Sequence, residues 1–330
     1  RRQRQMCIRD RVYTLVKLVD EWLADEKTLP SKEERHQEGQ IIINSLCAYI
    51  RSSFPLAERH DELTLSYEKY KQKCQDKNQE VHSPQRIPLL KPKNTKATNT
   101  KQSHEEFVRD KSLFREEQEV RQTILSEIKK RLNGDKVKNK EITPGTWSYF
   151  EYNFSDAHFF YAVNFNNSYF GASLNFLGAT FTGYANFSGA TFTQANFYRA
   201  TFTGYASFSE ATFTERADFS GATFTQEAYF PGATFTQEAY FPGATFTERA
   251  DFSRAIFHSE PSFTDVLGKA RFSHKVAPES YSFGVDPDSP CKIEIEEQEH
   301  NGTKFIIPKG TMLFDPNELS EQEDNNSNDS

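Results

Sequence analysis

Histidine and cysteine are the residues best suited to metal binding and nucleophilic catalysis, and this chain has 8 and 4 of them in 330 residues. A zinc site requires these residues in close, regular pairs, and many hydrolases carry a motif such as HExxH or GxSxG. No such spacing or motif occurs, and P-loop and dinucleotide fingerprints are absent. We therefore predict no catalytic residue, no cofactor and no metal. The cysteines are too scattered for a disulfide framework and are typical of a reducing cytoplasm.

Carboxylates and arginines also recur in the second half of the chain. An active site needs unlike groups that converge on one point, whereas here similar groups return at a fixed period. The pattern indicates solvated edges with local ion pairs, and we expect a protein that is not an enzyme. The residues concerned are Glu215, Arg216, Asp218, Glu227, Glu238, Glu248, Arg249 and Asp251.

The part of the chain that contains these charged residues also contains a regular repeat of phenylalanine. The chain has 30 Phe, against 2 Met and 2 Trp, so one side chain fills one recurring place. Steps of five or six residues separate the members of the register, and Ala lies two positions before most of them. The register consists of Phe154, Phe159, Phe165, Phe170, Phe176, Phe181, Phe187, Phe192, Phe197, Phe202, Phe208, Phe213, Phe219, Phe224, Phe230, Phe235, Phe241, Phe246, Phe252, Phe257 and Phe263.

This spacing predicts a solenoid. In Ala-x-Phe the two side chains point to one face of an extended segment. The next pair follows so soon that the chain must turn between them, and Gly189, Gly221 and Pro231 suit such corners. Repeated turns in one sense would give about five coils with Phe stacked inside. A sixth residue in many units, such as Tyr184 or Arg216, is expected to bulge at alternate corners.

Some units match a known pattern, A(D/N)FXX. They include Ala185-Asn186-Phe187-Ser188-Gly189 and Ala217-Asp218-Phe219-Ser220-Gly221. Over about residues 150–275 the chain resembles the bacterial pentapeptide-repeat family. The resemblance implies a right-handed quadrilateral parallel β-helix. The order of a helical region followed by the repeat is similar to that of a subgroup of the family. Some members of this subgroup carry membrane helices further upstream.

Amphipathic patterns on both sides predict further elements. Apolar residues at helical spacing indicate a helix over 12–23, a second that starts at the capping box of Ser31, and a third from Ser103 to Leu132. The second is expected to bury Ile41, Ile42, Leu46, Tyr49 and Ile50. Trp147, Tyr149 and Phe150, with Phe160 and Tyr161, are expected to cap the solenoid. Alternating residues on both sides of Asn301-Gly302 predict a C-terminal β-hairpin.

The chain thus divides into seven segments. Residues 1–10 look like translated sequencing-adapter sequence, and we expect the natural N-terminus to be missing. The others are a helical region (11–74), a flexible linker (75–102), a long helix (103–134), the pentapeptide-repeat β-helix (143–275), a C-terminal cap with a hairpin (276–317) and a disordered acidic tail (318–330). We expect a cytoplasmic location, with membrane attachment only through the missing N-terminal segment.

The predicted function is that of a non-enzymatic structural scaffold. It would bind an unknown protein partner through the solenoid surface, without direct nucleic-acid binding. Threonines of the recurrent Thr-Phe-Thr sequence form the candidate interaction face, namely Thr180, Thr182, Thr201, Thr203, Thr223, Thr225, Thr245 and Thr247.

Two alternatives remain open. The resemblance implies DNA-mimic binding or protection of DNA gyrase, but residues 148–275 hold 7 Lys/Arg against 11 Asp/Glu, a modest negative charge for such a mimic. Ranks of Thr would also suit ice or ordered water, although Thr is equally a common strand former.

Overall fold

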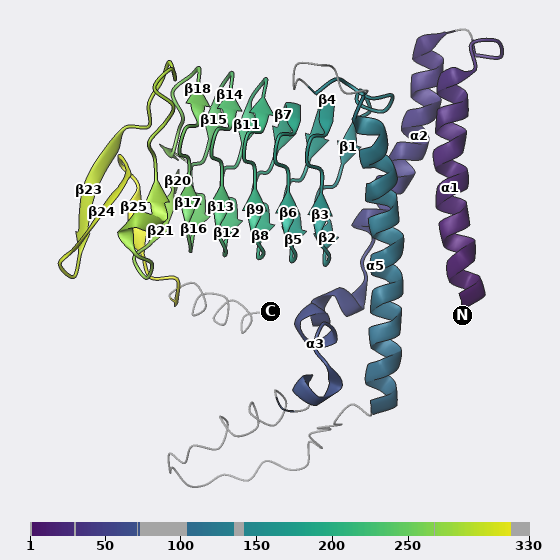
Figure 1. Ribbon diagram of the computed structural model, residues 1–330, viewed down its shortest axis with the longest axis horizontal. Helices are drawn as coiled ribbons and strands as arrows, with labels where there is room; N and C mark the ends of the chain where they lie inside the picture. Colours follow the sequence, from purple (N-terminus) through teal and green to yellow (C-terminus); the bar gives the residue numbers. More distant parts are fainter. Residues whose placement is uncertain are drawn as a thin grey trace. The chain divides into compact units, whose positions relative to one another are not determined.

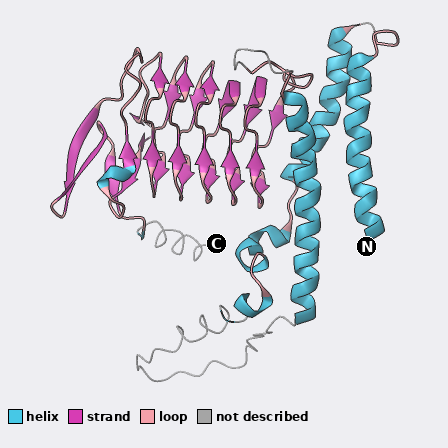
Figure 2. Cartoon of the chain, viewed as in Figure 1, coloured by secondary structure: helices cyan, strands magenta, loops and turns pink. Residues whose placement is uncertain are grey.

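The structure is a computed structural model that describes residues 2–29, 31–70, 72, 104–134, 142–266 and 268–317. The predicted linker (75–102) and acidic tail (318–330) lie outside the described residues. The chain forms two compact units, one of residues 1–53 with 120–330 and one of residues 54–119. Helices precede a long series of short strands (Figures 1 and 2).

The first two helices are α1 (Arg2–Ala24) and α2 (Lys32–Arg51). The Ser31 hydroxyl accepts a hydrogen bond from the Glu34 N–H at 3.3 Å, as its capping box predicts. The expected burial of Ile41 is wrong, because its side chain is 60% exposed while Ile43 is buried. The expected burial of Ile42, Leu46 and Ile50 is confirmed, and the same face also includes Gly39 and Cys47 at three- and four-residue steps.

The smaller unit contains η1 (Pro55–Arg59), α3 (His60–Leu63) and the first part of α5 (His104–Leu132). Arg59 joins these elements, since its guanidinium lies 2.9 Å from the Glu62 carboxylate and 2.8 Å from that of Asp110. Phe107 is buried under the rings of Tyr67 and Tyr70.

The predicted parallel β-solenoid is confirmed, with a four-sided course. Its strands pair in four columns, and each column forms one side. The first holds β1 (Tyr152–Asn153), the ends of β4 (Tyr169–Asn175) and β7 (Thr191–Asn196), β11 (Ala217–Asp218) and β15 (Ala239–Tyr240). The second holds β2 (His158–Phe159), β5 (Thr180–Phe181), β8 (Thr201–Phe202), β12 (Thr223–Phe224), β16 (Thr245–Phe246), β21 (Arg271–Ser273) and β25 (Met312–Phe314).

The third column holds β3 (Val163–Asn164), β6 (Ala185–Asn186), β9 (Ala206–Ser207), β13 (Ala228–Tyr229), β17 (Ala250–Asp251) and β22 (Tyr281–Ser282). The fourth holds the beginnings of β4 and β7, then β10 (Thr212–Phe213), β14 (Thr234–Phe235) and β18 (Ile256–Phe257). Thr180 pairs with Thr201 and Thr201 with Thr223, intervals of 21 and 22 residues. The shorter coil contains the one run of three five-residue steps, Phe187 to Phe202.

The phenylalanine register lies inside this solenoid. All 21 rings are buried, and Phe263 has the largest exposed fraction, 5%. Each ring stacks on an equivalent ring one coil away, as Phe202 does on Phe224 at 4.9 Å between centroids and 2° between planes. Rings of opposite columns meet edge to face across the interior, as Phe208 and Phe219 do at 5.2 Å. Both geometries are favourable for aromatic pairs.

Ten corners of the solenoid have the features of type II turns. In each, the residue two after Phe has a positive φ, and the N–H of the residue three after Phe donates to the Phe carbonyl, as Ala190 does to Phe187 at 3.1 Å. Gly fills this position at Gly189 (φ 64°), where a type II turn favours it. Arg199 and Glu210 adopt the same conformation.

The residue before Phe supports these corners. At seven of them its Asn or Asp side chain accepts a hydrogen bond from the N–H of the residue after Phe, as Asn186 does from Ser188 at 3.0 Å. At two others Tyr replaces Asn, and the residue after Phe is Pro231 or Pro242. Because Pro has no N–H, those corners need no acceptor. This exchange explains why AYFPG and ANFSG both occur.

The helices cover the first coil. His36 of α2 stacks on Phe150 at 4.6 Å, and Gln40 exchanges hydrogen bonds with the backbone of Glu151 at 2.8 and 2.9 Å. A Cβ on Gly39 would come within 2.6 Å of the Phe150 ring, so only Gly allows this approach. Trp147, Phe150, Phe160 and Tyr161 are buried in the cap, whereas Tyr149 is exposed.

The solenoid continues beyond Phe263. Phe272 follows Phe263 by nine residues and not by five or six, yet its ring stacks on Phe246 at 5.0 Å and 7°. A short loop containing β19 (Thr264–Asp265) and β20 (Gly268–Lys269) is inserted between Phe263 and β21. Because this loop interrupts the regular spacing, the sequence does not show that the solenoid continues. Phe283 likewise stacks on Phe252. The predicted C-terminal hairpin is confirmed as β23 (Ile295–His300) and β24 (Thr303–Pro308).

Replacing Asn186 by Ala should destabilise the fold by about 1 kcal/mol, because the half-buried Ser188 N–H loses its acceptor. Adding Ser188→Pro should restore most of this loss by removing the N–H. Urea denaturation of the single and double variants measures both effects. The reverse pair offers a control: Pro231→Ser should destabilise, and Tyr229→Asn should rescue it. Additive losses in either pair would contradict this account of the corner.

Replacing Phe213 by Ala should cost about 3–5 kcal/mol, because it removes a buried ring stacked on both Phe192 and Phe235. Phe213→Asp should be more damaging, since it buries an unpaired charge. The exposed Gln237→Ala is the control and should be nearly neutral. Denaturation that leaves Phe213→Ala as stable as this control would refute the packed column.

Candidate interaction faces

The candidate threonines lie on the second column of the solenoid. Thr180, Thr201, Thr223 and Thr245 are direct neighbours across adjacent strands. The second Thr of each unit follows at the corner, where its hydroxyl is used internally. Those of Thr203, Thr225 and Thr247 donate to the Phe carbonyl of the coil below, at 3.2, 3.2 and 2.7 Å. These hydroxyls brace successive coils.

Thr245 does not lie on an open face. Its side chain is buried, and its hydroxyl accepts a hydrogen bond from the Arg271 guanidinium at 2.9 Å. Arg271 belongs to β21, the next strand of the column, and it follows the inserted β19–β20 loop. We call the remaining seven residues the threonine face. They are Thr180, Thr182, Thr201, Thr203, Thr223, Thr225 and Thr247.

Two exposed tyrosines border this face. Tyr184 and Tyr205 lie at the same corner of successive coils and are 45% and 47% exposed. The spacing of the repeat predicts Tyr184 only as an extra residue at a corner. The exposure of Tyr184 could have been predicted from this position, since a residue that bulges at a corner presents its side chain to solvent. We call Tyr184 and Tyr205 the tyrosine edge.

Paired charges occupy the first and third columns. Arg216 lies 3.0 Å from the Asp218 carboxylate and 4.3 Å from the centroid of the Tyr240 ring. Arg249 similarly lies 2.6 Å from Asp251, with its guanidinium over Tyr229. Each Arg thus joins two coils by an ion pair and a cation–π contact. The arginines neutralise the carboxylates beside them.

The described residues contain no group of three or more His, Cys, Asp or Glu side chains arranged to hold a metal ion. Burial raises the pKa of the Cys47 thiol to about 12, so this group stays protonated at neutral pH and is a poor nucleophile. His158 is bound to the Thr182 hydroxyl at 2.9 Å, and His274 stacks on His300. Among the described helices, none has the length and apolar character needed to cross a bilayer.

Asp251 should contribute to stability in a pH-dependent manner. Burial raises the pKa of its carboxyl, but hydrogen bonds from Ser253 and from Arg249 outweigh this and hold it below the usual 3.8. A lowered folded pKa gives stability that is complete above the unfolded value and is lost as the pH falls through the folded value.

Melting curves between about pH 6 and about pH 2.5 should therefore show a smaller acid-induced loss in Asp251→Asn than in the wild type. The exposed Glu238→Gln should follow the wild type. Equal acid losses in wild type and Asp251→Asn would rule out this contribution.

Comparison with known proteins supports the repeat. A family model described as pentapeptide repeats (9 copies) matches residues 187–233, 197–244 and 227–267. No curated protein and no solved structure gives a significant match. The matched residues lie within the coils whose Phe columns and Asn-supported corners are described above. Sequence match and coil geometry agree that residues 187–267 consist of pentapeptide repeats.

Proposed function

We propose that the chain is a non-enzymatic scaffold that binds a protein partner through the threonine face and the tyrosine edge. The observation that carries this proposal is the exposure of Tyr184 and Tyr205 beside strands whose residues are in direct register. Tyr supplies a large contact area with little conformational freedom to lose. The stacked column beneath fixes the backbone, so binding would order few groups.

The charge arrangement gives less support to the DNA-mimic alternative. A mimic needs many regularly spaced negative charges. Here Arg216 and Arg249 are paired with Asp218 and Asp251 on two columns, which interrupts any acidic series.

The threonine hydroxyls give less support to ice or ordered-water binding. An ice-binding array would need rows of hydroxyls directed to solvent. Those of Thr203, Thr225 and Thr247 instead donate to backbone carbonyls, and Thr245 is covered.

Photo-crosslinking tests the proposal. A benzophenone side chain at position 205 should capture a specific protein from cells that express the chain. The same group at Tyr13, an equally exposed Tyr on α1, should not capture it. The double variant Tyr184→Ala/Tyr205→Ala should retain its melting temperature and lose most of the complex in a pull-down of the captured protein. Equal capture at both positions, or undiminished pull-down, would reject the proposed face.

A further inference from the structure

A cavity of about 490 Å³ lies between helix α2 and the first column of the solenoid. Its helical wall is one stripe of α2, since Asn44, Cys47 and Arg51 follow one another at steps of three and four residues. Gln40, one turn before this stripe, is bonded to the backbone of Glu151. The stripe is therefore held against the first coil.

Two asparagines on adjacent coils form the opposite wall. Asn153 of β1 pairs with Asn175 of β4, and both lie on the outer side because their neighbours Tyr152 and Leu174 are buried inside. Each Oδ1 accepts a hydrogen bond at 3.0 Å from the N–H two residues later. Within the described ranges neither Nδ2 group has a hydrogen-bond partner. This wall therefore presents amino groups that can donate to a ligand.

The charged residues of this cavity are unpaired. Arg51, the last residue of α2, is exposed and forms no ion pair with any described residue. Glu151 is also exposed, and the described part of the chain gives it no ion-pair partner either, although both residues line the same cavity. Asn44 adds a further donor, because its Oδ1 accepts from Gln40 at 2.9 Å and its Nδ2 remains. The lining thus offers one cation, one anion and several amide donors.

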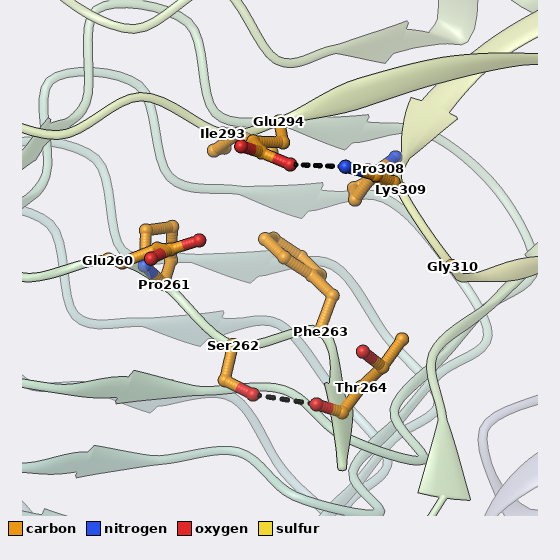
Figure 3. A pocket seen from close by; sticks show the side chains of 10 residues that line it. All are labelled: Glu260, Pro261, Ser262, Phe263, Thr264, Ile293, Glu294, Pro308, Lys309 and Gly310. Carbon is orange, nitrogen blue, oxygen red and sulfur yellow. Dashed lines mark hydrogen bonds and ion pairs between the residues drawn. The ribbon is translucent and has the colours of Figure 1, made fainter.

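Cations in two other cavities are already paired. At the C-terminal end of the solenoid, Lys309 lies 2.9 Å from the Glu294 carboxylate (Figure 3). In the cavity beside α1, Arg131 lies 2.7 Å from Asp20. The ion pairs there complete the charge balance within the protein. At Arg51 the balancing charge has to come from a ligand.

We propose that the cavity beside Arg51 binds the zwitterion of a free α-amino acid. The ligand carboxylate lies against the Arg51 guanidinium, whose paired N–H donors match the two carboxylate oxygens, and against the amino groups of Asn153 and Asn175. The ligand ammonium group lies beside Glu151. The volume of the cavity falls within the range of small-molecule sites. This site is separate from the threonine face and does not depend on the function proposed for it.

Nuclear magnetic resonance of the isotope-labelled full chain tests the site. L-alanine should shift the side-chain NH₂ signals of Asn153 and Asn175 in a saturable manner. The amide of Asn186 supports an equivalent corner on the third column, and its signal should not move. Propanoate lacks the ammonium group and L-alaninamide lacks the carboxylate. Each should bind more weakly than L-alanine, by roughly fivefold or more, because one charge-assisted contact is lost.

Protein variants supply a matched control. Arg51→Gln should weaken L-alanine binding by roughly tenfold or more, since the guanidinium holds the carboxylate. Glu151→Gln should remove the preference for L-alanine over propanoate. Arg11→Gln, which changes an exposed arginine of α1, should leave binding unchanged.

Three results would overturn the proposal. They are the absence of saturable shifts with L-alanine, binding of propanoate or L-alaninamide as tight as that of L-alanine, and equal effects of Arg51→Gln and Arg11→Gln. All three substituted side chains are exposed, so the variants should keep the wild-type melting temperature. None of these results would bear on the crosslinking at Tyr205.

Discussion

The stacking of each phenylalanine ring on its equivalent one coil away is the interaction on which the rest of the structure depends. Rings such as Phe208 and Phe230, 4.9 Å apart and nearly parallel, allow one residue type at each inward position. Ala lies two positions before most of the rings, where the stacked column leaves little space. The coil length is then fixed, since rings stack only if successive coils place Phe in register. Strands of two residues suffice because the column, and not the strand, supplies the buried area.

Corners are the second constraint, and they determine which residues surround Phe. A tight turn leaves an N–H that must find an acceptor. Asn186 and Asp218 supply one, and Pro231 removes the need for it. This local choice has a consequence for the surface. Where Pro follows Phe, the preceding position is released from its structural role, and Tyr229 and Tyr240 occupy it and contact arginines of the neighbouring coil.

Much of the fold could be predicted because a single residue type, Phe, recurs at the period of the coils. The Phe register predicted the solenoid, and Asn301-Gly302 predicted the hairpin. Features without a period could not be predicted. The loop before Phe272 shifts the register of the repeat. The burial of Ile43 and the exposure of Ile41 depend on contacts that helical spacing does not specify. The candidate threonines were predicted as a row, but the cover over Thr245 comes from Arg271, a residue that follows that loop. The tyrosine edge needed the corner geometry to be recognised.

The two ends of a solenoid pose a problem that its sides do not. Every coil satisfies the backbone of the next, so unpaired groups can accumulate only where coils stop. At the N-terminal end, α2 covers the first coil through Gly39 and Gln40. At the other end the hairpin buries its own Phe305 and Ile307, and the Phe305 ring lies 6.5 Å from that of Tyr281 in the last strand of the third column. The two ends are thus closed in different ways, the first coil by a helix from outside the repeat and the last coil by the residues that follow it, including β25 beside β21.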